Sequence, residues 1–211
     1  MGFTSNDLFK SRIMSLIAQE VALACHPETP SQSVRTIRAR VSQAPNGGIA
    51  IAYFIEGQIS RLCLPGRSAP SRIDGLWQHT CLEAFVAVKD APGYHEFNFA
   101  PSGQWAAYGF KSYREGAPLP QASDPQIARR ASANCFELDA LIQQASLPAV
   151  PVNGRLLLGL SAVIEEQDGV RSYWSLKHPP GRPDFHHASA FVLEWPPHVA
   201  AIRDPAYTGK R

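Results

Sequence analysis

Apolar and polar residues alternate along most of the chain, which is the pattern of β-strands with one buried face and one exposed face. The segments CLEAFVAV (81–88), an apolar run with one glutamate, and YHEFNFA (94–100) are both strongly strand-like. Alternation in the second segment places Glu96 and Asn98 on one face, opposite Phe97 on the other. Strands are predicted, in chain order, over residues 37–41, 49–55, 59–64, 81–88, 94–100, 104–110, 127–132, 134–138, 155–164, 171–177 and 189–194.

Turn-forming residues separate these segments and predict how the strands are connected. PNGG (45–48), DAPG (90–93) and PSG (101–103) each lie between two predicted strands and are typical of hairpin turns. Such signals recur about every 8–12 residues, and no strand–helix–strand rhythm accompanies them. We therefore expect an all-β protein, a single antiparallel β-sandwich of the jelly-roll type, with at most one or two short helices.

The same pattern predicts how far the domain extends. Residues 1–20 are expected to form an N-terminal extension, helical or disordered, before a sandwich over residues 21–198 and a C-terminal tail over 199–211. One short helical turn is expected at residues 139–145, with Asp139 as its N-cap.

Composition narrows the class of protein. Apolar residues make up 45% of the chain and charged residues 18%, as in globular proteins that bury a core. The formal net charge is +2, and no dense stripe of lysine and arginine accompanies it. We therefore expect neither nucleic acid nor a membrane as a partner.

The cysteines and the N-terminal segment indicate the compartment. The four cysteines are widely spaced and form no CxxC pair, which argues against a structural zinc site and favours free thiols. In IMSLIAQEVALAC (13–25), Gln19 and Glu20 interrupt the apolar run that a secretion signal requires. We expect a cytoplasmic protein, and Met1 and Met14 both stay open as its natural start.

Two stretches near the middle of the chain carry candidate binding residues. Glu83 lies within an apolar predicted strand shortly after Trp77, and a buried carboxylate is costly unless it is paired. Glu96 and Asn98 share a strand face, and Trp105 follows the next turn. Aromatic rings beside carboxylate and amide groups suit a sugar, whose C–H face stacks on the ring while its hydroxyls form hydrogen bonds. Core packing of the aromatics, or an exposed position for Glu83, is the alternative.

A third stretch, YWSLKHPPGRPDFHH (173–187), is rich in histidine. His186 and His187 are adjacent, so on an extended chain they point in opposite directions and cannot both bind one metal. His178 and His186 could converge if the PPGRP loop folds back. No HExxH or HxH spacing is present. We expect a pocket edge rather than a metal centre, with Asp184, His186 and His187 supporting the loop.

Three separated motifs together resemble a known superfamily. DGLWQHTCLEAFV (74–86), EFNFAPSGQWAAYGFKSYREG (96–116) and the 173–187 stretch resemble, in this order, the DOMON-like superfamily. Within it they most resemble the bacterial MurB-associated subgroup of small DOMON-like proteins. The resemblance covers about residues 20–195. The superfamily also includes the family 9 carbohydrate-binding modules and haem-binding cytochrome domains.

This resemblance implies a carbohydrate-binding-module-like sandwich that holds a ligand against one sheet. The family 9 modules bind a sugar between two aromatic rings, and a tryptophan precedes a strand glutamate in them as Trp77 precedes Glu83 here. By resemblance Trp77 is one wall, and Trp174 is our candidate for the second. At the position where the modules place a basic side chain, this chain has Gln104 and Trp105, which departs from the family pattern.

We therefore expect a ligand-binding module for a small carbohydrate or similar polar molecule, without a resident cofactor. Its ligand-binding residues are expected to be Trp77, Glu83, Glu96, Asn98, Trp105, Trp174 and His178. A haem- or metal-binding protein stays open as one alternative, through His178 and His186. Glycoside hydrolysis by Glu83 and Glu96, as an enzyme or accessory domain of cell-wall sugar metabolism, is another. A homodimer through a free edge strand also stays open.

Overall fold

The computed structural model describes residues 18–44, 47–152 and 154–195 of the chain. The strands in these residues are β1 (Ala18–Cys25), β2 (Val34–Gln43), β3 (Ile49–Gly57), β4 (Cys81–Val88), β5 (Tyr94–Phe99), β6 (Trp105–Ser112), β7 (Glu115–Pro118), β8 (Gln126–Ala131), β9 (Cys135–Ile142), β10 (Leu156–Glu165), β11 (Arg171–Ser175) and β12 (Leu193–Trp195). Four 3-10 turns accompany them: η2 (Ile59–Arg61), η3 (Leu76–Gln78), η4 (Gln144–Ser146) and η5 (Ala188–Ala190). Residues 1–17 of the expected extension, residues 45–46 of the expected first turn and the expected tail lie outside the described residues.

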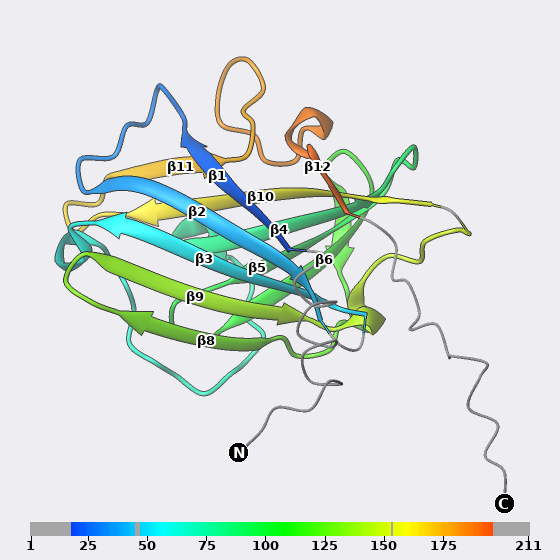
Figure 1. Ribbon diagram of the computed structural model, residues 1–211, viewed down its shortest axis with the longest axis horizontal. Coiled ribbons are helices and arrows are strands. Elements are labelled where there is room, and N and C mark those ends of the chain that lie inside the picture. Colours follow the sequence, from blue (N-terminus) through cyan, green and yellow to red (C-terminus); the bar gives the residue numbers. More distant parts are fainter. Residues whose placement is uncertain (1–17, 45–46, 153, 196–211) are drawn as a thin grey trace, which may run out of the picture.

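The strands form a β-sandwich of two antiparallel layers (Figure 1). One layer has the order β1–β2–β3–β9–β8, and the other has the order β11–β10–β4–β5–β6–β7. Strand β1 pairs with β2 and also with β11, so the two layers are continuous along that side. Strand β12 pairs with the first residues of β10, beside the part of β10 that pairs with β11. The all-β sandwich expected from the alternating pattern is confirmed.

The core lies between the layers and is built from alternate strand positions. In β3 every second residue is buried, with Ile51, Tyr53 and Ile55 pointing inward. The hydroxyl of Tyr53 crosses the core and donates a hydrogen bond of 2.7 Å to the backbone carbonyl of Glu83. This alternation is what a sheet with one solvent-exposed face produces.

Strand β4 differs, because almost every residue in it is buried. Leu82, Ala84 and Val86 face the core between the layers, and the outer face of β4 is also covered. Phe85, on the outer face, stacks against Phe191 with ring centroids 5.6 Å apart, in a second apolar cluster. The layer containing β4 is therefore covered on both faces, and loops cover its outer side.

The structure corrects five sequence predictions of strands, turns and domain bounds. Residues 59–64 are not a strand: they begin with η2, and the Cys63 N–H donates to the Glu165 carbonyl outside any regular ladder. The expected helical turn at 139–145 is mostly strand, because Ala140 and Ile142 alternate as buried positions of β9 paired with β3. The sheet already includes Ala18, in β1, so the sandwich does not begin at residue 21. The strand expected at 189–194 is η5 followed by β12, and β11 ends at Ser175.

The described residues contain no disulfide and no membrane-spanning helix. All four cysteines are free. Within the described residues, no helix is long and apolar enough to cross a membrane.

A close approach of two backbones makes one glycine sensitive to substitution. A Cβ atom on Gly57 would overlap the carbonyl oxygen of Ser33 and lie 2.9 Å from the Cα of Val34. We expect Gly57→Ala to lower the free energy of unfolding by about 1–3 kcal/mol, because backbone atoms must move to make room. Urea denaturation measures the change. The matched control is Gly66→Ala, where no atom lies within 4 Å of the added carbon; equal midpoints for the two variants would contradict the prediction.

Candidate functional site

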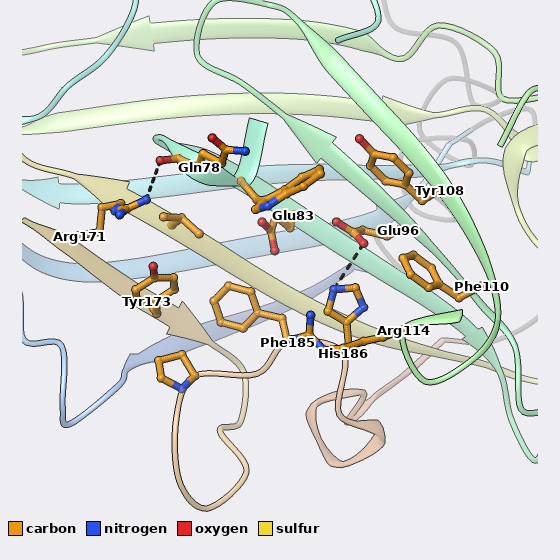
Figure 2. A pocket seen from close by; sticks show the side chains of 13 residues that line it. Gln78, Glu83, Glu96, Tyr108, Phe110, Arg114, Arg171, Tyr173, Phe185 and His186 are labelled. Atoms are coloured by element: carbon orange, nitrogen blue, oxygen red, sulfur yellow. Dashed lines mark hydrogen bonds and ion pairs between the residues drawn. The ribbon is translucent and has the colours of Figure 1, made fainter. Parts of the chain in front are cut away.

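A cavity of about 390 Å³ opens on the outer face of the layer that contains β4, β5 and β6. Its walls are mainly aromatic, and its charged or ionisable members come from five separate segments (Figure 2). The aromatic residues are Trp77, Tyr108, Phe110, Tyr173 and Phe185. The ionisable side chains besides the tyrosines are Glu83, Glu96, Arg114, Arg171 and His186.

Strand register places two carboxyl groups on the floor of this cavity. Glu83 on β4 lies opposite Asn98 on β5, and Phe85 lies opposite Glu96. Because successive residues alternate between faces, Glu83 and Glu96 share the outer face as diagonal neighbours. Figure 2 shows both carboxyl groups between Tyr173 on one side and Tyr108 on the other. The side chains of Glu83 and Glu96 are 2% and 5% exposed, so both are buried.

Among the described residues, each carboxyl group has one hydrogen-bond donor. Ser161 on β10 donates to Glu83 Oε2 at 3.0 Å. The amide of Asn98 donates to Glu96 Oε1 at 2.7 Å, and the Cys81 thiol in turn donates to Asn98 Oδ1 at 3.6 Å. Asn98 lies on the same face of the sheet as the two glutamates, is fully buried, and orients Glu96.

Burial changes the ionisation of both carboxyl groups. Burial and the neighbouring charge of Glu96 raise the pKa of Glu83 well above its ordinary value, although the hydrogen bond from Ser161 opposes this. Burial raises the pKa of Glu96 to about 7, against the opposing effects of Asn98 and Arg114. Both carboxyl groups are therefore harder to ionise than an exposed glutamate.

The loop between β11 and η5 forms one side of the cavity. Asp184 anchors it, accepting hydrogen bonds from the Tyr113 hydroxyl at 2.7 Å and from the Arg114 guanidinium at 2.9 Å. The backbone N–H of His186 also donates to Asp184, at 3.1 Å. His187 lies at the N-cap of η5, where its side chain accepts from the Ser189 N–H.

His186 points into the cavity rather than into the loop. Its Nε2 lies 3.7 Å from Glu96 Oε2, and its Nδ1 lies 2.9 Å from the hydroxyl of Tyr94. Burial and the charge of Arg114 lower the pKa of His186 to about 4. The imidazole is therefore neutral at pH 7, and the contact with Glu96 is not an ion pair there.

The structure brings together some of the predicted site residues. Trp77, Glu83 and Glu96 line the cavity, and Asn98 contacts Glu96 directly. Trp77 is 43% exposed at η3, with its ring edge-on to Tyr108 at a centroid distance of 5.7 Å.

The two other predicted tryptophans face the opposite side of the sheet. Trp174 pairs with Ala162 in the β10–β11 ladder, so it points into the core, and its indole N–H donates to Ser172 at 3.0 Å. Trp105 is also buried in the core, below the guanidinium of Arg72. The prediction that Trp174 forms a wall of the site is wrong, because Tyr173, one residue earlier, takes the outward position.

His178 also lies outside the cavity lining. Its Nε2 is 2.9 Å from the Ala24 carbonyl oxygen, and its ring packs edge-on against His26 at 4.8 Å. The ring of Phe185 separates it from the site, at a centroid distance of 6.4 Å. His178 and His186 thus have different partners and do not share a common ligand position.

Sequence reasoning missed several lining residues. Tyr173 could have been found, because strand alternation places it opposite Trp174. Arg114 lies in a turn with positive φ, and Phe185 lies in an irregular loop, so no local periodicity indicates where either side chain points. Within residues 18–44, 47–152 and 154–195, no group of three or more His, Cys, Asp or Glu side chains is arranged to hold a metal ion.

Comparison with known proteins identifies the fold. No protein-family model and no curated protein matches this sequence. Among solved structures, a candidate carbohydrate-binding protein from Bacteroides uniformis is similar, with a TM-score of 0.61, 14% identity, and coverage of 89% of this chain and 88% of that chain. A family 9 carbohydrate-binding module from Caldicellulosiruptor kristjanssonii, in complex with cellotriose, has a TM-score of 0.45 and 11% identity over 80% of this chain and 77% of that chain. The first likeness shows that this chain shares the β-sandwich fold of that protein.

Proposed function

We propose that this protein is a binding module that holds a small carbohydrate or a similar polar molecule in the cavity above β4, β5 and β6. The observation that carries the proposal is the pair of buried carboxyl groups, Glu83 and Glu96, at the floor of an aromatic-walled cavity. Buried carboxyl groups destabilise a fold unless new hydrogen bonds or charges offset the loss of their hydration, and a bound ligand can supply these contacts.

The size and lining of the cavity suit such a ligand. A volume of about 390 Å³ lies within the range of roughly 300–1,000 Å³ that small-molecule sites occupy. The rings of Trp77 and Tyr108 offer apolar surfaces for the C–H face of a sugar. A carboxylate accepts hydrogen bonds from sugar hydroxyls, and a protonated carboxyl group also donates one. The floor and walls therefore supply the two kinds of contact that a polyhydroxylated ring needs.

The resemblance of three motifs to the DOMON-like superfamily supports the same proposal. In that resemblance Trp77 and Glu83 belong to the ligand site, and both line the cavity here. The second aromatic wall would be Tyr173 or Phe185, which lie across the cavity, in place of Trp174. The Bacteroides protein has a similar β-sandwich, and this fold is compatible with the proposed function.

Loss of the exposed tryptophan tests this function. We expect Trp77→Ala to weaken binding of the best ligand in a panel of mono- and disaccharides by about tenfold or more, equal to about 1.4 kcal/mol, because the stacking surface is lost. Isothermal titration calorimetry measures the change. The matched control is Phe54→Ala, an aromatic on β3 in the other layer, under the guanidinium of Arg40. The proposal fails if the wild-type protein binds no sugar of the panel, or if Trp77→Ala binds as tightly as Phe54→Ala.

A further inference from the structure

The buried carboxyl groups of the cavity differ from the third buried glutamate of the protein. Glu166 is equally buried, but it accepts hydrogen bonds from the Ser31 hydroxyl at 2.7 Å, from the Gln32 N–H at 3.0 Å, and from the N–H and hydroxyl of Ser33. These donors lower the pKa of Glu166 and stabilise its charge. Glu166 is therefore a carboxylate whose partners are all supplied by the fold.

Glu83 and Glu96 lack such a set of donors. Among the described residues, no hydrogen-bond donor reaches Glu83 Oε1. Glu96 Oε2 also accepts no hydrogen bond from them, and His186 Nε2 lies 3.7 Å away. Figure 2 shows the carboxyl groups of both residues on the cavity side of the sheet. Each glutamate thus presents one oxygen to the cavity without a hydrogen-bond donor from the described part of the protein.

The cations near the cavity have other partners. The Arg114 guanidinium donates to Asp184 at 2.9 Å and to the Tyr113 hydroxyl at 3.2 Å. The Arg171 guanidinium donates to the Gln78 carbonyl oxygen at 2.9 Å, at the edge of the cavity. His186 is neutral at pH 7. The floor therefore combines two acidic groups with no fixed cation hydrogen-bonded to either of them among the described residues.

We propose that the preferred ligand of this cavity carries a protonated amine, as an amino sugar or another polyhydroxylated amine does, and that its ammonium group binds between Glu83 Oε1 and Glu96 Oε2. This inference rests on the proposed function. An ammonium group has three donors and no acceptor, which matches two carboxyl oxygens without donors. The surrounding rings of Trp77, Tyr108 and Tyr173 add a second attraction, because the face of an aromatic ring binds a cation.

The ionisation of the pair agrees with this ligand. Burial raises the pKa values of both Glu83 and Glu96, and a cation between their free oxygens would favour the charged carboxylates that burial opposes. The ionisable groups around the pair are, on the cavity side, Tyr108, Arg114, Arg171, Tyr173 and His186, and, within the fold, Tyr53, Cys81 and Tyr94. An amine that stays protonated up to pH 8 should therefore bind more tightly at pH 8 than at pH 6, because the carboxyl groups ionise more readily at the higher pH.

A matched series of sugars tests the inference. The wild-type protein is titrated calorimetrically at pH 7.5 and low salt with glucosamine, galactosamine and mannosamine, with the three parent hexoses, and with the three N-acetyl derivatives. At least one amine is expected to bind about tenfold or more tightly than its parent hexose, since a hydrogen bond to a charged group contributes about 1.5–3 kcal/mol. The N-acetyl derivative of that sugar, which is neutral, is expected to lose this advantage.

Two variants test whether Glu83 and Glu96 cause the preference for amines. Glu83→Gln and Glu96→Gln keep the shape of the side chain, and each is expected to reduce the amine-to-hexose affinity ratio at least about threefold while circular dichroism confirms the fold. Glu28→Gln, an exposed glutamate between β1 and β2, is the control and should keep the wild-type ratio. If hexoses and amines bind equally well, the inference is wrong and the proposed function stands. If no sugar of the series binds, both are wrong.

Discussion

Replacing Trp174 with alanine is expected to lower the free energy of unfolding by about 3–5 kcal/mol, because the substitution leaves a large cavity between the two layers. The side chain of Trp174 is 5% exposed and belongs to the main core cluster. The substitution also removes the donor to the buried hydroxyl of Ser172. Denaturation with guanidinium chloride, followed by circular dichroism, measures the loss.

The exposed tryptophan of the binding cavity provides the control. Trp77→Ala is expected to change the free energy of unfolding by less than about 1 kcal/mol, since the ring already contacts solvent. Trp174→Phe keeps most of the core volume and should cost clearly less than Trp174→Ala. Trp77→Ala should weaken ligand binding, whereas Trp174→Phe should leave the ligand affinity unchanged. Equal unfolding midpoints for the two alanine variants would contradict the core position of Trp174.

Replacing Glu96 with glutamine is expected to stabilise the ligand-free protein by roughly 3 kcal/mol at pH 7.5 and by almost nothing near pH 4.5. Burial raises the pKa of Glu96 from an ordinary value of 4.5 to about 7. Between these pH values the folded protein holds a proton that the unfolded chain has already released, so stability falls as the pH rises. Each pH unit of this interval costs about 1.4 kcal/mol, and glutamine has no proton to lose.

The measured quantity is the difference between wild type and variant, because other groups titrate in the same interval. The pKa of His186 is lowered to about 4, so the unfolded chain binds a proton there that the folded protein does not. This group makes stability rise with pH up to about 6.5 and opposes the effect of Glu96. Subtracting the two stability curves cancels most of this contribution.

The exposed carboxyl group of Glu28 serves as the control for the Glu96 series. Glu28→Gln should shift the unfolding curve by less than about 0.5 kcal/mol at every pH. Denaturation with urea at half-unit intervals from pH 4.5 to pH 8 gives the curves. A difference between Glu96→Gln and wild type that stays constant across this range would show that Glu96 titrates normally.

Strand periodicity correctly predicted most strands and the faces of several side chains. The faces assigned to Glu96, Asn98 and Phe97 agree with the register of β4, β5 and β6. These assignments depend only on backbone geometry, because side chains of a strand alternate wherever the strand lies. The same rule applied to residues 171–177 would have placed Tyr173 and Trp174 on opposite faces.

Periodicity failed where distant segments decide the outcome. It does not tell which face of a strand is covered, so it could not correct the choice of Trp174 as a cavity wall, which came from the family resemblance, although Trp174 faces the other layer. Periodicity also does not distinguish an inner from an outer face in β4, because this strand is an apolar run that is buried on both faces. The loop carrying Phe185 and His186 is held by contacts of Asp184 with Tyr113 and Arg114, about 70 residues earlier in the chain.

The amino-acid sequence by itself determined the class of fold, the positions of most strands and the faces on which the two cavity glutamates lie. These features follow from local backbone geometry and from the alternation of apolar and polar residues. Only the tertiary structure decided that Glu83 and Glu96 form one buried pair, that Tyr173 rather than Trp174 borders the cavity, and that no arginine neutralises the floor by a direct hydrogen bond within the described residues. Strands β4 and β5 are joined by a short hairpin, but the loop that closes over them comes much later in the chain, after β11, and local sequence does not place it there.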